Sequence, residues 1–315
     1  MDRSTIDASA FTFVMATGIV SVAAALQGLR VVSDVLFALA ALAWIVLAAA
    51  LAVRGERRAH PSLQSFALVA GTVVVGDRVL LYGHVDGGLA LWSLAVAWWV
   101  ALVVRVPRLG NASGGSLLAV VAVEALAALA ASLALRASGG LLAPAIAWWV
   151  LGLALYPLVA AAIVRELRMR FRFTPDLWVL MGALAITTLA GADLLLAARG
   201  LHRLAGLQRA LRDVDLATWI VASTWVVPVV ALEVRARDTW RDLRGRWSFV
   251  FPLGMYSVAT WTLARVVSFS PFGEIARVAC FVALAAWGVV LVLSSRSLRP
   301  ALDAHRRRRD CAGAG

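Results

Sequence analysis

The sequence predicts an all-α integral membrane protein with ten transmembrane helices. Of its 315 residues, 62% are hydrophobic and only 15% are charged, whereas a typical soluble domain is about half apolar and about a quarter charged. Ten apolar stretches also follow one another along the chain, and most have the roughly 20 residues that a helix needs to cross a hydrocarbon core about 30 Å thick. Composition and segment length therefore agree on a membrane protein.

The ten stretches account for nearly the whole chain. The predicted spans are 10–27, 33–53, 61–82, 88–104, 116–135, 143–164, 175–198, 213–233, 247–267 and 273–295. Their connections are too short to hold a soluble domain. We therefore predict an N-terminal segment over 1–9, one ten-helix membrane domain over 10–295 and a basic tail over 296–315.

The arginines predict how the chain is oriented. Lysine is absent, so all 30 basic residues are arginines, and the formal net charge is +12. With a cytoplasmic N-terminus, 21 arginines fall in cytoplasmic segments, 6 on the opposite side and 3 within spans. This bias follows the positive-inside rule, which predicts a bacterial-type inner (plasma) membrane protein with both termini in the cytoplasm. The charge then serves orientation and contact with anionic lipid, and no nucleic-acid partner is expected.

Ionisable residues deep inside the spans lie almost entirely in the odd-numbered ones. These are Asp77, Arg78, Glu124, Asp193 and Arg265, whereas the even-numbered spans carry mainly aliphatic residues and tryptophans. An ionisable group in hydrocarbon is costly unless it faces protein, water or a partner. We therefore expect five helical hairpins around a central pore, with the odd helices inside and the even helices outside. This arrangement is typical of a channel or transporter.

Small and hydroxyl-bearing residues are also more frequent in the odd spans. Glycine and threonine let membrane helices approach closely, and they can line a water-filled cavity. The pore-lining candidates are Thr17, Gly18, Thr72, Gly76, Gly182, Thr187, Gly254 and Val258. Ordinary helix packing would explain the same residues, and this alternative stays open.

Three segments carry a resemblance to a known family. The first span reads Phe11-Thr-Phe-Val-Met-Ala-Thr-Gly-Ile-Val-Ser21, the seventh Leu180-Met-Gly-Ala-Leu-Ala-Ile-Thr-Thr-Leu-Ala-Gly-Ala-Asp193, and the ninth Trp247-Ser-Phe-Val-Phe-Pro-Leu-Gly-Met-Tyr256. In this order, on ten spans, they resemble the tellurite-resistance/C4-dicarboxylate transporter family, also called the voltage-dependent anion channel superfamily. Its members include plant slow-type anion channels, fungal malate permeases and fungal sulfite exporters. The resemblance covers residues 10 to 295.

The resemblance implies a homotrimer in which each subunit passes small inorganic or dicarboxylate anions through its own pore. It also implies that a phenylalanine of the ninth helix plugs this pore. Here we expect the gate at Phe251, directly before Pro252, with Phe249 as the second candidate. The sequence departs from the family at Val73 and Glu124, where the resemblance implies polar amides near the pore.

Phe251 fits this role physically, because a ring in a narrow apolar constriction can gate by excluding water. Its helical stripe also contains Gly254, which leaves room for movement, and it ends at Arg265. Arg265 and Arg78 could attract anions. They could equally form structural ion pairs with Asp77 or Asp193, and both interpretations stay open.

Glu124 lies near the middle of the fifth span among apolar residues. A carboxyl group that binds a proton there could couple proton movement to anion movement, or it could pair with an arginine of another helix. The alternatives to a gated anion pore are therefore a proton-coupled dicarboxylate or oxyanion carrier that uses Glu124, or a membrane sensor without transport activity.

Other classes of function find little support in the sequence. It contains no HExxH motif and no serine nucleophile beside a base, so we expect neither an enzyme nor catalytic residues. The four histidines, His60, His84, His202 and His305, lie in loops or the tail. We therefore expect no metal site and no cofactor. Chloride, nitrate, sulfite, C4-dicarboxylates and a tellurium oxyanion are all candidate substrates.

Overall fold

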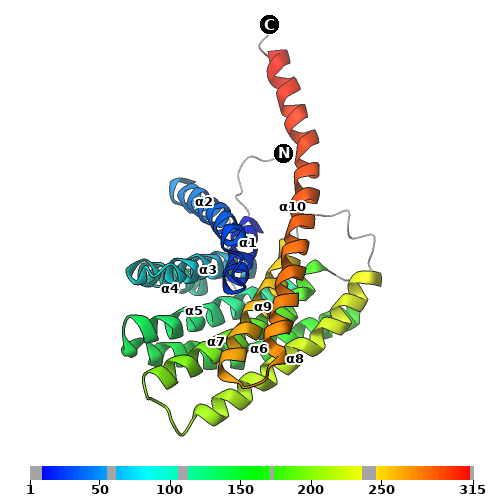
Figure 1. The fold of residues 1–315 in the computed structure, drawn as a ribbon. Coiled ribbons are helices and arrows are strands. Elements are labelled where there is room, and N and C mark those ends of the chain that lie inside the picture. The colour runs from blue at the N-terminus through cyan, green and yellow to red at the C-terminus, as the bar shows by residue number, and fades with distance from the viewer. Residues whose placement is uncertain (1–8, 55–61, 106–112, 171–173, 236–245, 313–315) are drawn as a thin grey trace.

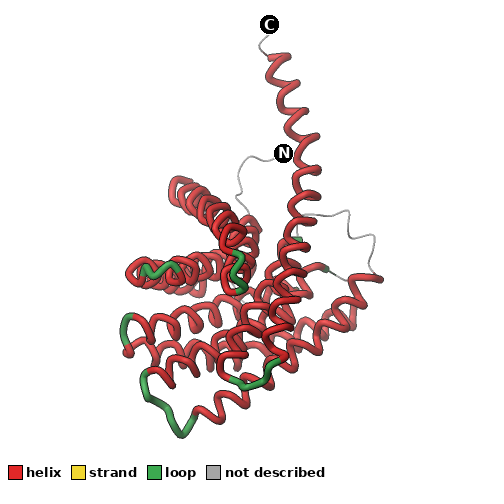
Figure 2. Tube along the Cα trace, in the orientation of Figure 1, coloured by secondary structure: helices red, strands yellow, loops and turns green. Residues whose placement is uncertain are grey.

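The computed structural model describes residues 9–54, 62–105, 113–170, 174–235 and 246–312, in which helices are joined by turns and loops and no β-strand occurs (Figure 1). Short loops join the helices where the connections are described (Figure 2). The long helices are α1 (Ser9–Leu26), α2 (Arg30–Arg54), α3 (Ala67–Leu81), α4 (Val85–Arg105), α5 (Leu118–Arg136), α6 (Leu142–Arg170), α7 (Val179–Gly200), α8 (Gln208–Arg235), α9 (Trp247–Val266) and α10 (Pro271–Ala312). They follow the ten predicted spans in order.

Several helix bounds differ from the prediction. The helix α8 begins before its predicted span, α6 runs on to Arg170, and α10 continues through the predicted tail to Ala312. Nearly all of the predicted N-terminal segment 1–9 lies outside the described residues. Eight of the described helical spans are long and apolar enough to cross a membrane, and Ala10–Leu26 is a shorter apolar helix.

Three of the odd helices begin with the same local structure. One-turn 3₁₀ helices, η1 (Leu63–Phe66), η2 (Gly114–Leu117) and η4 (Pro175–Trp178), lead into α3, α5 and α7, while η3 (Gly139–Leu141) leads into α6. In η1 the Ser62 N–H donates to Ser65 Oγ, and in η2 the Ser113 N–H donates to Ser116 Oγ. These serines occupy the end of a helix, where backbone N–H groups lack helical partners. The odd helices therefore start from a recurring serine or Thr-Pro signal.

Tight turns join α1 to α2 and α3 to α4. Gly28 and Gly83 adopt φ values of +80° and +90° in these turns, a backbone region that glycine enters without steric cost. Each odd helix contacts the even helix that follows it. We call the end of the bundle that carries these odd-to-even connections the turn end.

The five odd helices contact one another in a closed cycle. The helix α1 packs on α3, α3 on α5, α5 on α7, α7 on α9, and α9 returns to α1. The spans of α3, α5 and α7 are 72% to 89% buried, whereas the even helices are only 11% to 28% buried. The residues of α1 and α9 are also mostly buried. The odd helices thus form an inner layer with the even helices outside it, while the pore itself stays a prediction.

Tryptophans of the outer layer tie neighbouring hairpins together. One tryptophan on each even helix donates its indole N–H to the next odd helix in the cycle. The pairs are Trp44 to Thr72 Oγ1, Trp92 to Leu126 O, Trp149 to Thr187 O, Trp219 to Thr260 Oγ1 and Trp287 to Thr17 Oγ1. We call these five contacts the indole links. The last one connects α10 back to α1, so that the series of links runs around the whole cycle.

Candidate functional site

The face of α9 that points into the cycle can be found by elimination. Pro252 contacts Gly182 of α7, Gly254 contacts Ile19 and Val20 of α1, and Ser257 donates to Ala276 O of α10. Tyr256 and Thr260 bond to residues of α8. At 100° per residue, the face left between the α7 and α1 contacts carries Phe251, Met255, Val258 and Thr262. Phe251 is fully buried there.

The same elimination on the other odd helices identifies an apolar interior. It assigns Met15 and Ile19 of α1, Val73 of α3, Ala125 of α5 and Ile186 of α7 to the inner face, and each of these side chains is at most 2% exposed. Together with Phe251, they fill the middle of the cycle with hydrocarbon. An apolar constriction of this kind excludes water and therefore ions.

Phe249 points elsewhere. Its ring packs edge-to-face on Trp178 with a centroid distance of 4.7 Å. Trp178 in turn donates its indole N–H to Glu233, which forms a 2.8 Å ion pair with the buried Arg246. Phe249 thus belongs to a packing cluster between the start of α7, the end of α8 and the start of α9. Between the two gate candidates, the geometry favours Phe251.

The predicted pore-lining residues mostly lie at helix contacts. Thr17 and Thr72 accept the indole links of Trp287 and Trp44, and Thr187 lies beside Glu124. A Cβ on Gly18, Gly76, Gly182 or Gly254 would come within 3 Å of a side chain on a neighbouring helix. These glycines therefore let the odd helices approach one another, whereas Val258 lies on the inner face of α9.

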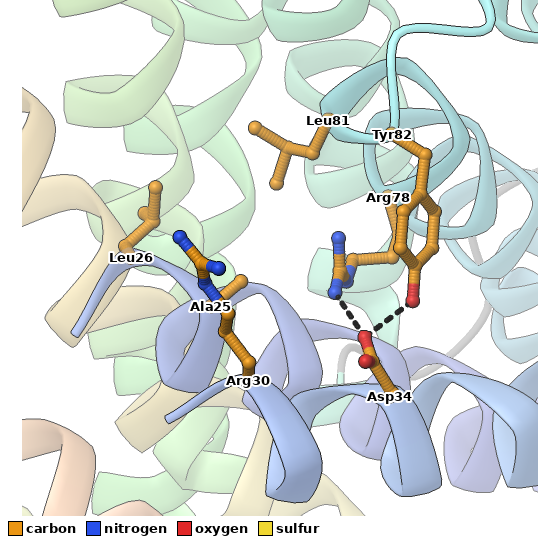
Figure 3. Close-up of a pocket in the computed structure, with 7 residues that line it drawn as sticks. All are labelled: Ala25, Leu26, Arg30, Asp34, Arg78, Leu81 and Tyr82. Atoms are coloured by element: carbon orange, nitrogen blue, oxygen red, sulfur yellow. Dashed lines mark hydrogen bonds and ion pairs between the residues drawn. The ribbon is translucent and has the colours of Figure 1, made fainter. Parts of the chain in front are cut away.

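Arg78 is bound at the turn end by groups from α1 and α2 (Figure 3). Its Nε donates to Ser33 Oγ at 3.1 Å and to Ser21 Oγ at 3.3 Å, and its Nη2 lies 2.9 Å from Asp34 Oδ1. The sequence argument offered Asp77 or Asp193 as partners. That prediction was wrong for Arg78, because Asp77 is adjacent on α3 and points about 100° away from it, toward the inside of the cycle.

A pocket of about 280 Å³ opens beside this cluster. The side chains of Arg30 and Arg78 both reach it, and the Tyr82 hydroxyl donates to the same Asp34 oxygen that pairs with Arg78 (Figure 3). The guanidinium of Arg78 also lies over the Tyr82 ring, 4.1 Å from its centroid. Two guanidinium groups around one pocket can bind a carboxylate or oxyanion.

A second polar group gathers where the inner faces meet the turn end. Asp193 accepts a hydrogen bond from Ser132 and interacts electrostatically with Arg265 and Arg136. Asp77 interacts with Asp193 and with Arg136, whose Nη1 also donates to Leu80 O. The interaction of Asp193 with Arg265 is electrostatic, and an ion pair between them stays a prediction. We call these residues, Asp77, Ser132, Arg136, Asp193 and Arg265, the mouth cluster.

Comparison with known proteins fits this architecture. A model of the voltage-dependent anion channel family matches residues 5–294, nearly the whole chain. The chain belongs to the voltage-dependent anion channel family. Two relatives are uncharacterized membrane proteins of Mycobacterium tuberculosis, strains CDC 1551 / Oshkosh and ATCC 25618 / H37Rv. Each is 30% identical over 152 residues, which are 45% of this chain and 73% of the relative. Family membership makes this a multi-pass membrane protein of the anion channel and transporter class.

Glu124 does not face the interior of this anion channel family member. Its Oε1 lies 2.9 Å from Thr187 Oγ1 on α7 and occupies the space left by the missing side chain of Gly152 on α6. No arginine contacts Glu124 among the described residues. The carboxyl group is fully buried between α5, α6 and α7.

Sequence reasoning missed Asp34, Arg136 and Asp215. Asp34 and Asp215 lie near the ends of even helices, where charged residues are usually explained by the membrane interface, and Arg136 ends α5. Asp215 is nevertheless fully buried. The available signal was that all three lie at the same predicted end of the bundle as Asp77, Arg78, Asp193 and Arg265.

Proposed function

We propose that the protein passes small anions along the axis of the odd-helix cycle, and that Phe251 is the gate. The supporting observation is the position of Phe251, which is fully buried on the face of α9 that lies between its contacts with α7 and with α1. The apolar middle would then hold the path closed, and displacement of one aromatic ring would open it. Five hairpins around this axis would form the conducting unit.

The polar turn end suits the entry of anions. Arg265 and Arg136 of the mouth cluster interact with Asp193, and Arg30 and Arg78 line the pocket at the turn end. Positive groups at an opening raise the local anion concentration. Chloride or nitrate would need only this mildly positive path, whereas sulfite or a C4-dicarboxylate would gain from two guanidinium groups at once.

Orientation and assembly belong to the same proposal. The excess of arginine at the opposite end supports a cytoplasmic location for both termini, so that the turn end faces away from the cytoplasm. The family resemblance supports a homotrimer with one pore in each subunit. Exposed aliphatic residues on the even helices would then face lipid or the neighbouring subunits.

The test is anion flux in proteoliposomes for wild type, Phe251→Ala and the matched control Phe249→Ala, with chloride, nitrate, sulfite and malate compared. We expect Phe251→Ala to raise flux by at least about tenfold, which corresponds to a barrier lowered by about 1.4 kcal/mol. Phe249→Ala should leave flux near the wild-type level, because its ring packs on Trp178. Equal effects of both substitutions would contradict Phe251 as the gate. Absence of flux from all three folded proteins would contradict the channel and favour a coupled carrier or a sensor.

A further inference from the structure

Asp215 is a fully buried carboxyl group without a hydrogen-bond partner. It lies on α8, where neither Oδ1 nor Oδ2 has a partner among the described residues. Its Oδ1 occupies the space that a side chain at Gly191 of α7 would fill, with the Trp149 ring at the edge of the same space. An ionised carboxylate in such a place is very costly, because no cation or N–H group compensates for lost water.

Glu124 occupies a similar position at another glycine, because its carboxyl group fills the space at Gly152 of α6. Trp149 donates its indole N–H to Thr187 O, and Thr187 Oγ1 lies 2.9 Å from both Ala183 O and Glu124 Oε1. A threonine hydroxyl has only one hydrogen. A proton on Glu124 satisfies both contacts at once, because Thr187 then donates to Ala183 O while Glu124 donates to Thr187. The geometry itself therefore favours a protonated Glu124.

The two carboxyl groups lie beside consecutive turns of α7, because Glu124 contacts Thr187 and Asp215 lies at Gly191. Asp215 interacts electrostatically with both Asp193 and Glu124, and Asp193 interacts with Asp77. Thr187 and Asp193 are six residues apart on α7, a rise of about 9 Å. Acidic groups thus follow α7 from the turn end into the middle of the bundle. Among the described residues, the charged groups that interact with this series are Arg136 and Arg265, both at the mouth.

We propose that Glu124 and Asp215 form a proton-binding pair behind α7, in which Glu124 fills the space at Gly152 and Asp215 fills the space at Gly191. A hydronium ion gives its proton to an ionised carboxylate of the pair and leaves as water, and the carboxyl group becomes ionised again when it returns that proton to water. The pair lies outside the inner face that carries Phe251. Proton binding is thus separable from gating, whereas its coupling to anion movement rests on the proposed function.

The first test is infrared difference spectroscopy on exchange of H₂O for D₂O, which detects protonated carboxyl groups and does not require anion flux. Wild type is compared with Glu124→Gln, Asp215→Asn and the control Asp213→Asn, an exposed neighbour on α8 that pairs with Arg212. We expect two protonated carboxyl bands in wild type and in the control, and loss of one band in each test variant. A wild-type spectrum without such bands, or one that either test variant leaves unchanged, overturns the pair.

The second test measures proton movement with a pH-sensitive dye inside proteoliposomes while an anion gradient is imposed. We expect proton movement to accompany anion flux in wild type and in Asp213→Asn, and to be lost in the Glu124→Gln/Asp215→Asn double variant while anion flux persists. Unchanged proton movement in the double variant would overturn the coupling. If wild type shows the infrared bands but no anion flux, the proton-binding pair stands and the proposed channel function fails.

Discussion

Asp34 holds the guanidinium of Arg78 where an incoming anion would bind. The Asp34 side chain is 55% exposed, whereas the Arg78 side chain is only 6% exposed. Of the two members of this ion pair, Asp34 is therefore the one that can turn toward solvent. Two serine hydroxyls and the Tyr82 ring would still hold Arg78 in place. If the protein passes anions as proposed, Asp34 would compete with the anion for Arg78.

Removing that competitor is expected to strengthen anion binding at the turn end. Asp34→Asn leaves an oxygen that can accept from Arg78 and Tyr82 but removes the negative charge, so the anion concentration for half-maximal flux should fall severalfold. The measurement is flux against anion concentration in proteoliposomes. The control is Asp86→Asn, an exposed acid at the same end. A concentration dependence that rises or stays unchanged in Asp34→Asn would contradict a competing role for Asp34.

Contacts between residues on different helices could not be predicted from the sequence. Helical spacing predicted that Phe251, Val258 and Arg265 lie on one side of the ninth helix. In the structure, Phe251 and Val258 lie on the same face of α9. The partner of Arg78 could not be predicted in this way, because Asp34 is 44 residues away. Which residues meet depends on the rotation of each helix about its axis, and packing between helices sets that rotation.

At the scale of the element, the length of each apolar run predicted the ten helices and their order. A run of about 20 apolar residues and the polar segment that ends it can both be recognised within a short stretch of sequence. The indole links are not local signals. A tryptophan near a span end is equally consistent with an interfacial anchor, and only the cycle of contacts shows that five indoles reach the next odd helix. The glycines and threonines of the odd helices could likewise be assigned either to a pore lining or to helix packing, because the sequence does not show which helices they contact.

The indole links should contribute measurably to stability. Trp287→Phe keeps most of the ring but removes the 3.0 Å bond to Thr17 that joins α10 to α1, so we expect a loss of about 0.5–1.5 kcal/mol. The control is Trp99→Phe, because the Trp99 ring packs on Trp148 and its indole N–H forms no hydrogen bond among the described residues. Thermal unfolding in detergent compares the two variants. A smaller loss of stability in Trp287→Phe than in Trp99→Phe would contradict a structural role for the link.

For the whole molecule, closure of the cycle within one chain has a consequence for assembly. The return of α9 to α1 completes the inner layer without a second copy, and the link from α10 to α1 completes the series of indole links. A path along this axis is therefore bounded by a single subunit, whatever its oligomeric state. The resemblance predicted a homotrimer, and such a trimer would carry three separate paths.

Subunits that conduct separately should contribute additively to flux. Wild type and Phe251→Ala can be co-expressed with different tags in varied ratios, and mixed assemblies can be purified through both tags. Flux should then rise in a straight line with the fraction of Phe251→Ala subunits, because each open gate acts on its own path. A single path shared at the subunit interface would instead give a curved dependence, since all gates around it would have to open together. The straight line should also persist when subunits are diluted in lipid until single copies predominate, because one chain already contains all five odd helices and the mouth cluster.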